Sequence, residues 1–297
     1  EPVFALLGGI TAGEWAPVHG FCERMQVPNV FPVTDYPVIS DSDWYTLYFS
    51  KGYYQEGEAA ARFLRRTDAI TGDAAVVQVY RGTRRSRALA TGFAETRRKM
   101  GLPAARNLEL ADEVKADRAF WKGLVGENPG AVLALWLGGD DIASIGELST
   151  IEPRPPMVIA SSIVFGDAAL SVPEKLRDIT FFTKPDSFPE DEVRSRLATE
   201  SWLKAKKLPI TNFEIQAKMY FLGWTLAPMV KMMRDDFYRD YFLDIADMMR
   251  VQYYSIAIYP RLSFGPGQRY ASKGCYIVQL TGGEDPKLEK RSNWVVH

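Results

Sequence analysis

Short apolar runs alternate with amphipathic stretches along the first 185 residues, and this alternation is the strongest constraint on the fold. Val132–Leu137 and Met157–Ser161 are apolar runs of strand length, whereas Gly57–Arg66 and Arg87–Met100 repeat their apolar residues with helical spacing. Continuous apolar runs predict strands that are buried on both faces, and intervening helices predict that these strands pair in parallel. The first part of the chain is therefore expected to be α/β, with helices on both faces of a parallel sheet.

The pattern changes after Pro185. Three helical stretches follow without an intervening strand, and strand-like sequence then returns in two segments. The helical stretches are Glu190–Lys207, Asn212–Arg234 and Tyr238–Met249, and the strand-like segments are Ser255–Ile258 and Tyr276–Leu280. A length of 297 residues suggests about two domains at about 150 residues each. Because there is no internal repeat and no low-complexity linker, we expect the chain to pass between the domains several times.

Composition excludes several classes of protein. Lys and Arg total 36 against 37 Asp and Glu, and this balance gives no basic surplus with which to bind nucleic acid. No stretch reaches 18 apolar residues, so no direct membrane insertion is expected. The N-terminus has neither a basic region nor a cleavage site and begins almost within an apolar strand, which predicts a processed or shortened chain.

Catalytic and metal-binding motifs are scarce. Only two His and two Cys occur, which argues against a zinc cluster or a His-rich metal site. No Walker A loop, G-x-S-x-G elbow or H-E-x-x-H motif is present. A Ser or Cys nucleophile needs a nearby base, but His19 lies within a predicted helix and His297 is the last residue. We therefore predict a protein that is not an enzyme and that uses no cofactor or metal.

Polar side chains follow three of the predicted strands. Tyr80 ends the predicted strand Ala74–Tyr80 and Arg81 follows it, Asp140 follows Val132–Leu137, and Ser162 follows Met157–Ser161. Ligands of open α/β sheets bind beyond the carboxyl ends of the strands, so these residues are candidates for a binding site. Two alternatives remain open: Asp141 could simply cap the next helix, and the Arg-rich run from Arg81 could be a solvated face.

The order of the motifs resembles the type I periplasmic substrate-binding proteins of ABC transporters, specifically the branched-chain amino acid-binding (leucine/isoleucine/valine-binding) family. Phe4–Gly13 resembles the strand and loop that hold the ligand carboxylate, and Val27–Pro32 resembles the next strand. The three crossovers of the family resemble Tyr48–Gly57, Phe182–Pro185 and Pro260–Phe264, and its terminal strand pair resembles Gly274–Trp294.

This resemblance implies two Rossmann-like lobes joined by three crossovers. Lobe one would comprise residues 1–51 and 186–262, and lobe two residues 52–185 and 263–297. Lobe one would lack the N-terminal strands and helices that the family has. Cys22 and Cys275 would fall in different lobes, so no disulfide between them is expected.

The resemblance also implies the ligand-binding residues. In lobe one these are Thr11, Ala12, Gly13, Val33, Thr34 and Asp35. Ala12 stands where the family has a carboxylate-binding Ser, so backbone N–H groups would serve there, while Asp35 would repel a carboxylate unless it is paired. In lobe two, Ser162 stands where the family has an ammonium-binding Glu, and Asp140, which could replace that Glu, stands where it has an aromatic residue. A standard branched-chain amino acid is therefore not expected. The solute would be amino acid-like or aromatic or hydroxylated, and the Trp and Tyr content favours the aromatic or hydroxylated class.

The function implied by the resemblance is that of a periplasmic solute-binding protein. It would bind a small molecule in the cleft between the lobes, close by hinge motion and deliver the solute to a membrane permease. Two other functions remain open. One is a ligand-sensing domain of a receptor or regulator on the same fold, and the other is an α/β enzyme that uses Asp140, Asp35 or Ser162.

Overall fold

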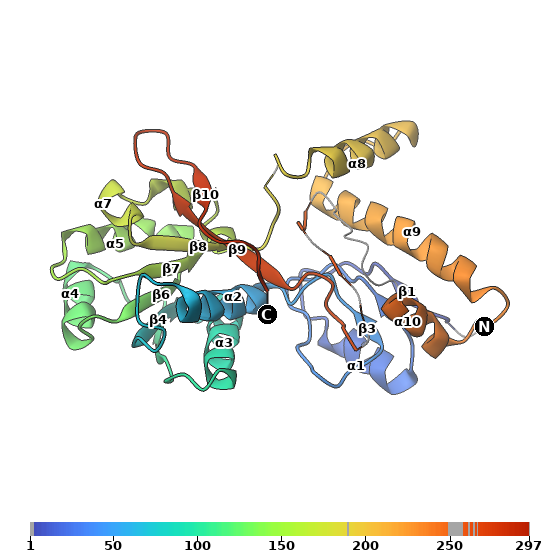
Figure 1. The fold of residues 1–297 in the computed structure, drawn as a ribbon, viewed down its shortest axis with the longest axis horizontal. Helices are drawn as coiled ribbons and strands as arrows, with labels where there is room; N and C mark the ends of the chain where they lie inside the picture. Colours follow the sequence, from blue (N-terminus) through green and yellow to red (C-terminus); the bar gives the residue numbers. More distant parts are fainter. Residues whose placement is uncertain are drawn as a thin grey trace. The chain divides into compact units, whose positions relative to one another are not determined.

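The computed structural model of the chain forms two compact units (Figure 1). It describes residues 3–188, 190–248, 258–260, 262–263, 265 and 267–296. Unit 1 comprises Glu1–Gly52 and Asp186–Lys273, and unit 2 comprises Tyr53–Pro185 and Gly274–His297, so the chain passes from one unit to the other three times.

The last passage follows Lys273, later than the boundary at residue 262 that the motifs suggested. The reason is a set of hydrogen bonds within unit 1. The Ser263 N–H donates to the Ala271 carbonyl (2.9 Å), and the Ala271 N–H donates to the Tyr48 carbonyl (3.0 Å). Residues 255–257 of the expected strand, and residues 261 and 264 of the expected third crossover, lie outside the described residues.

Unit 2 is built on an eight-stranded sheet with the order β10-β9-β8-β7-β6-β4-β5, and β11 also pairs with β9. The strands are β4 (Val76–Arg81), β5 (Arg106–Leu110), β6 (Val132–Trp136), β7 (Val158–Ser161), β8 (Thr180–Lys184), β9 (Gly274–Leu280), β10 (Leu288–Lys290) and β11 (Val295–Val296). Strands β5, β4, β6, β7 and β8 are parallel, whereas β9 runs antiparallel to β8. Every residue of β6 and β7 is buried, which agrees with their continuous apolar sequence.

The helices of unit 2 are α2 (Tyr53–Arg66), α3 (Arg84–Lys99), α4 (Arg118–Glu127), α5 (Ile142–Gly146), α6 (Ser162–Phe165) and α7 (Glu174–Arg177). Helix α2 precedes β4, and the other helices connect the parallel strands. Leu64 of α2 and Phe93 of α3 pack in one buried cluster with Trp136 of β6, so these two helices cover the same face of the sheet (Figure 1). Strand β5 and helix α4 occupy a region for which the sequence pattern predicted no element.

The backbones of α2 and α3 touch through two glycines. A Cβ atom on Gly57 would lie 2.1 Å from the Leu89 carbonyl oxygen, and one on Gly92 would lie 2.1 Å from the Tyr54 carbonyl oxygen. Any side chain at either position would therefore push the helices apart.

Unit 1 has a small parallel sheet with the order β1-β2-β3. Its strands are β1 (Leu6–Leu7), β2 (Asn29–Val30) and β3 (Thr46–Leu47), and its helices are α1 (Ala16–Met25), α8 (Val193–Ala205), α9 (Phe213–Met233) and α10 (Arg239–Met248). Single parallel bridges extend the pairing, from Ile10 to Val33 and from Tyr48 to Tyr270. Helix α9 begins where the Asn212 side chain accepts the Ile215 N–H, as the sequence pattern predicted.

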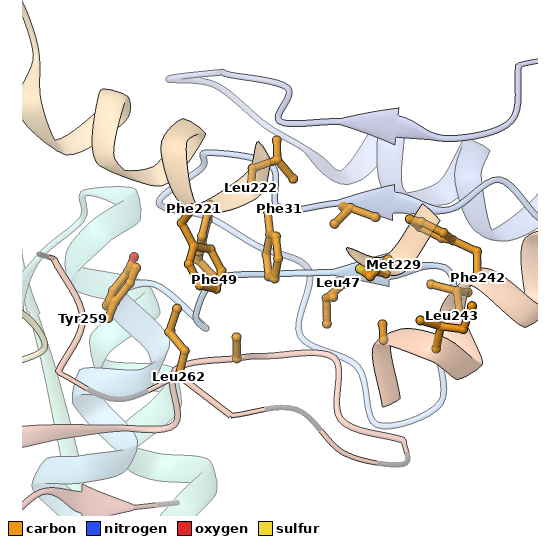
Figure 2. Close-up of a cluster of buried hydrophobic side chains, with 14 of the residues drawn as sticks. Phe31, Leu47, Phe49, Phe221, Leu222, Met229, Phe242, Leu243, Tyr259 and Leu262 are labelled. Atoms are coloured by element: carbon orange, nitrogen blue, oxygen red, sulfur yellow. The ribbon is translucent and has the colours of Figure 1, made fainter. Parts of the chain in front are cut away.

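Unit 1 has a hydrophobic core of its own, shown in Figure 2. The Phe31 ring stacks on Phe49 with 4.5 Å between the ring centroids, and Phe221 of α9 packs against both rings. Phe242 and Leu243 of α10 complete the cluster at its other end (Figure 2). Among the described residues, no helix is both long enough and apolar enough to cross a membrane.

The contact between α2 and α3 generates a prediction on stability. Gly92→Ala should lower the free energy of unfolding by about 1–3 kcal/mol, because the new methyl group overlaps a backbone carbonyl. Gly123 of α4 is the matched control, since a Cβ atom added there would meet no other atom within 4 Å. Gly123→Ala should stabilise the protein by about 0.5–1 kcal/mol through helix propensity. Urea unfolding of both variants measures the difference, and equal stabilities would contradict the close contact.

Candidate functional site

Six of the candidate residues lie on two adjacent segments of unit 1. The Val33 N–H donates to the Gly9 carbonyl (2.7 Å), and the Thr11 N–H donates to the Val33 carbonyl (3.1 Å). Thr11, Ala12 and Gly13 follow one segment, and Thr34 and Asp35 follow the other. The chain thus brings all six residues to the same edge of the sheet, beyond the carboxyl ends of β1 and β2.

Side-chain hydroxyls close the turns at this edge. The Thr11 hydroxyl accepts the Gly13 N–H (2.9 Å), and the Thr34 hydroxyl accepts the Tyr36 N–H (3.1 Å). Ala12 and Gly13 are exposed, and so is Asp35. The Asp35 carbonyl approaches Gly52 so closely that a Cβ there would lie 2.2 Å away, and Gly52 has a φ of +57°. This position on the Asp35 loop therefore requires glycine.

A column of aromatic rings fastens the loop that follows Asp35. His19 stacks on Tyr48 at 5.9 Å between centroids, and Tyr48 stacks on Tyr270 at 5.7 Å. His19 bonds the Tyr48 hydroxyl through Nδ1 (2.9 Å) and the Asp43 carboxylate through Nε2 (2.7 Å). The Tyr270 hydroxyl donates to the Val38 carbonyl (2.8 Å). These bonds hold the loop at both its middle and its end.

Four candidate residues lie at the carboxyl edge of the sheet in unit 2. Tyr80 and Arg81 end β4, Asp140 lies in the short helical turn Gly139–Asp141 beyond β6, and Ser162 begins α6 directly after β7. Strands β4, β6 and β7 are consecutive in the parallel sheet, so these residues share one edge, as the strand pattern predicted. Asp140 is exposed, whereas Tyr80 is half-buried and Ser162 is buried.

Arg81 is engaged within unit 2. Its Nη2 atom donates to the Asp141 carboxylate (2.7 Å), and Nη1 donates to the carbonyls of Ala111 (2.6 Å) and Val114 (2.8 Å). The bond to Asp141 raises the pKa of the Arg81 guanidinium. Asp141 does not cap α5 through its side chain, which corrects the alternative that the sequence left open. The reason is that its carboxylate binds Arg81.

The hydroxyl of Ser162 is buried and makes no hydrogen bond among the described residues. Its neighbour Ser161 is fully engaged, because Ser161 Oγ donates to Glu56 (2.8 Å) and accepts the Val164 N–H (3.2 Å). Thr183 of β8 donates to the same Glu56 oxygen (2.6 Å). A buried hydroxyl without a partner costs about 1–3 kcal/mol, so Ser162 stands out as a group that lacks its hydrogen-bond partner.

Glu56 and Thr183 were not among the residues predicted from the sequence. Glu56 is 1% exposed and lies in α2 just before Gly57–Arg66, the stretch that the sequence predicted to be helical. Sequence signals for its burial are Gly57 and the alanines that follow, which indicate close packing. The described residues contain no group of three His, Cys, Asp or Glu side chains that could hold a metal ion.

Comparisons with known proteins report on the fold. No protein-family model matches the chain, and no curated protein is similar in sequence. Solved structures do match. A leucine-binding protein from Thermotoga maritima MSB8 aligns with a TM-score of 0.58 and 15% identity, over 95% of this chain and 79% of that one.

Two further matches bind other molecules. A fatty acid ABC transporter substrate-binding protein from Thermomonospora curvata aligns with a TM-score of 0.55 and 13% identity, over 96% of this chain and 74% of that one. The second is a solute-binding protein of an ABC transporter from Rhodopseudomonas palustris BisB5 in complex with 3,4-dihydroxybenzoic acid. It aligns with a TM-score of 0.56 and 14% identity, over 97% of this chain and 78% of that one. The fold is therefore the mixed α/β fold of the type I periplasmic binding proteins, as the motif order predicted.

The first prediction at the site concerns the ring column. Tyr270→Phe removes the hydroxyl that accepts the Ser40 N–H (3.0 Å). Because the lost hydrogen bond stabilises the closed loop by about 1 kcal/mol, amide exchange in Val38–Ser42 should become about fivefold faster. Hydrogen exchange followed by mass spectrometry measures this. Tyr45→Phe, which removes a bond to Asp240 (2.7 Å), should leave the exchange of these residues unchanged. Equal exchange in wild type and Tyr270→Phe would contradict the fastening role.

The second prediction concerns the buried carboxyl group. Thr183→Val keeps the side-chain shape but removes a donor from Glu56, so it should lower the free energy of unfolding by about 1–3 kcal/mol. Thr71 is exposed, and Thr71→Val should change stability by less than about 0.5 kcal/mol. Denaturant unfolding tests both variants; a Thr183→Val protein as stable as the control would rule out a stabilising role for this bond.

Proposed function

We propose that the chain is the extracytoplasmic solute-binding component of an ABC transporter and that it passes a small solute to a membrane permease. The observation that carries this proposal is the Ser162 hydroxyl, which is buried without a hydrogen-bond partner at the carboxyl edge of the parallel sheet. A solute that bonds Ser162 would offset the cost of burying it. The fold shared with solute-binding proteins supports the same role.

The residues of unit 1 suit a carboxylate. Ala12 is exposed in the Thr11–Gly13 turn, and its backbone N–H makes no hydrogen bond among the described residues, so it can bind an anion without help from a side chain. The hydroxyls of Thr11 and Thr34 lie at the same edge. Asp35 is exposed, so solvent and salt weaken its repulsion of a bound carboxylate.

Apart from Asp140, whose exposure to solvent and salt weakens its attraction for an ammonium group, the residues of unit 2 favour a hydroxyl group. The carboxylate of Asp141 is neutralised by Arg81, and the Glu56 oxygen is shared by two hydroxyls. Ser162 can donate to or accept from a solute hydroxyl. We therefore favour a hydroxylated aromatic carboxylate over a branched-chain amino acid, and the dihydroxybenzoate held by one structural match is a molecule of this class.

An α/β enzyme built on Ser162 receives no support from the geometry. A serine nucleophile needs a base within hydrogen-bond distance, but Ser162 Oγ has no partner among the described residues. His19 belongs to unit 1, where both of its ring nitrogens are already bonded. These contacts favour binding without catalysis.

A ligand panel tests the proposal. Thermal unfolding with benzoate, 4-hydroxybenzoate, 3,4-dihydroxybenzoate and L-leucine should reveal stabilisation by the hydroxylated acids, about 2.7 kcal/mol at 100 times the dissociation constant. Calorimetry should then show that Ser162→Ala weakens 4-hydroxybenzoate binding about fivefold, for the loss of about 1 kcal/mol, and leaves benzoate binding unchanged.

Two controls sharpen this test. Ser171→Ala changes an exposed serine and should leave every affinity unchanged. Thr34→Ala should weaken the binding of both benzoate and 4-hydroxybenzoate, because both molecules carry a carboxylate. Stabilisation by L-leucine alone would overturn the proposed solute class, and unchanged affinities in both Ser162→Ala and Thr34→Ala would overturn the proposed binding residues.

A further inference from the structure

A separate pocket of about 490 Å³ opens in unit 2, between the end of α3 and the start of β5. It is lined by Ala94, Glu95, Arg98, Gly101, Leu102, Ala104, Ala105 and Asn107. Strand β5 begins at Arg106, so the pocket lies at the amino ends of the parallel strands. The candidate residues of unit 2 follow the carboxyl ends, at the opposite edge of the sheet. The volume is in the range of small-molecule sites.

A buried network orients the amide of Asn107. Trp136 Nε1–H donates to Gln78 Oε1 (2.6 Å), and Gln78 Nε2–H donates to Asn107 Oδ1 (2.8 Å). Gln78 is completely buried in β4 and also donates to the Ala90 carbonyl (3.2 Å). Because Oδ1 is used in this way, the Asn107 NH₂ group remains available, and it makes no hydrogen bond among the described residues.

Two opposite charges accompany this amide. Glu95 accepts the Tyr54 hydroxyl at Oε2 (2.6 Å), and this bond fixes the carboxylate while leaving Oε1 open. The Arg98 side chain is exposed and makes neither an ion pair nor a hydrogen bond among the described residues. Glu95 and Arg98 are three residues apart on α3 and therefore share one helix face. The rest of the lining consists of small or apolar residues.

We propose that this pocket binds a small zwitterion, a molecule that carries one carboxylate and one ammonium group on a short apolar body. Arg98 and the Asn107 NH₂ group would donate to the carboxylate, and Glu95 would accept from the ammonium group. Ala94, Ala104 and Ala105 would give the body of the molecule an apolar surface to pack on. This site is independent of the proposed solute-binding residues, because it shares none of them.

Ligand-observed NMR titrations with L-alanine and β-alanine test the proposal. Wild type should bind at least one of them, and Arg98→Gln and Glu95→Gln should each weaken binding tenfold or more. Arg85→Gln is the matched control, since Arg85 is an exposed arginine of the same helix without a partner among the described residues. It should bind as wild type does.

Further arms of the experiment separate zwitterion binding from simple anion binding and from the proposed function. Ser162→Ala should leave zwitterion binding intact, and failure of all aromatic acids to bind would overturn the proposed function without affecting this site. Acetate that binds as tightly as L-alanine would overturn the proposal in favour of a simple anion site. Absence of binding by both zwitterions, or equal loss in Arg85→Gln and Arg98→Gln, would also overturn it.

Discussion

The close contact between α2 and α3 is the constraint on which unit 2 depends. Gly57 and Gly92 let each helix backbone meet a carbonyl group of the other helix. Glu56, the residue before Gly57, is thereby carried beneath the ends of β7 and β8, where Ser161 and Thr183 donate to it. A wider helix spacing would withdraw the carboxyl group and leave the buried Ser161 hydroxyl without an acceptor, which costs about 1–3 kcal/mol.

Both units prepare their candidate residues in the same way, by satisfying the polar groups that lie beneath them. In unit 2, Ser161 uses both of its bonding capacities, so the adjacent Ser162 is presented by a fixed turn with its own hydroxyl unpaired among the described residues. In unit 1, His19 and Tyr48 hold the loop that continues from Asp35. Polar groups that already have hydrogen-bond partners within the protein do not compete with the solute for the candidate residues. Because these groups are already ordered, little free energy is spent on rearranging them when a solute binds.

Prediction from sequence succeeded where local pattern and burial agree. The apolar runs of β6 and β7 are buried on both faces, and α9 begins at the Asn212 cap. Strand β5 was missed because it is an edge strand, in which Leu108 and Leu110 alternate with polar residues and only one face is covered. Helix α4 was missed although Asp117 caps it, because its short apolar face was not recognised as periodic.

The sequence by itself determined that β4, β6 and β7 alternate with helices, and with it the positions of Tyr80, Asp140 and Ser162 at one sheet edge. This follows because parallel strands joined by helices place all their carboxyl ends on the same side. Only the tertiary structure decided which of these groups are free to bind. Arg81 meets Asp141 across 60 residues of chain, and Glu56 meets Ser161 across 105. Such partners depend on how the helices pack on the sheet, and no local periodicity encodes that packing.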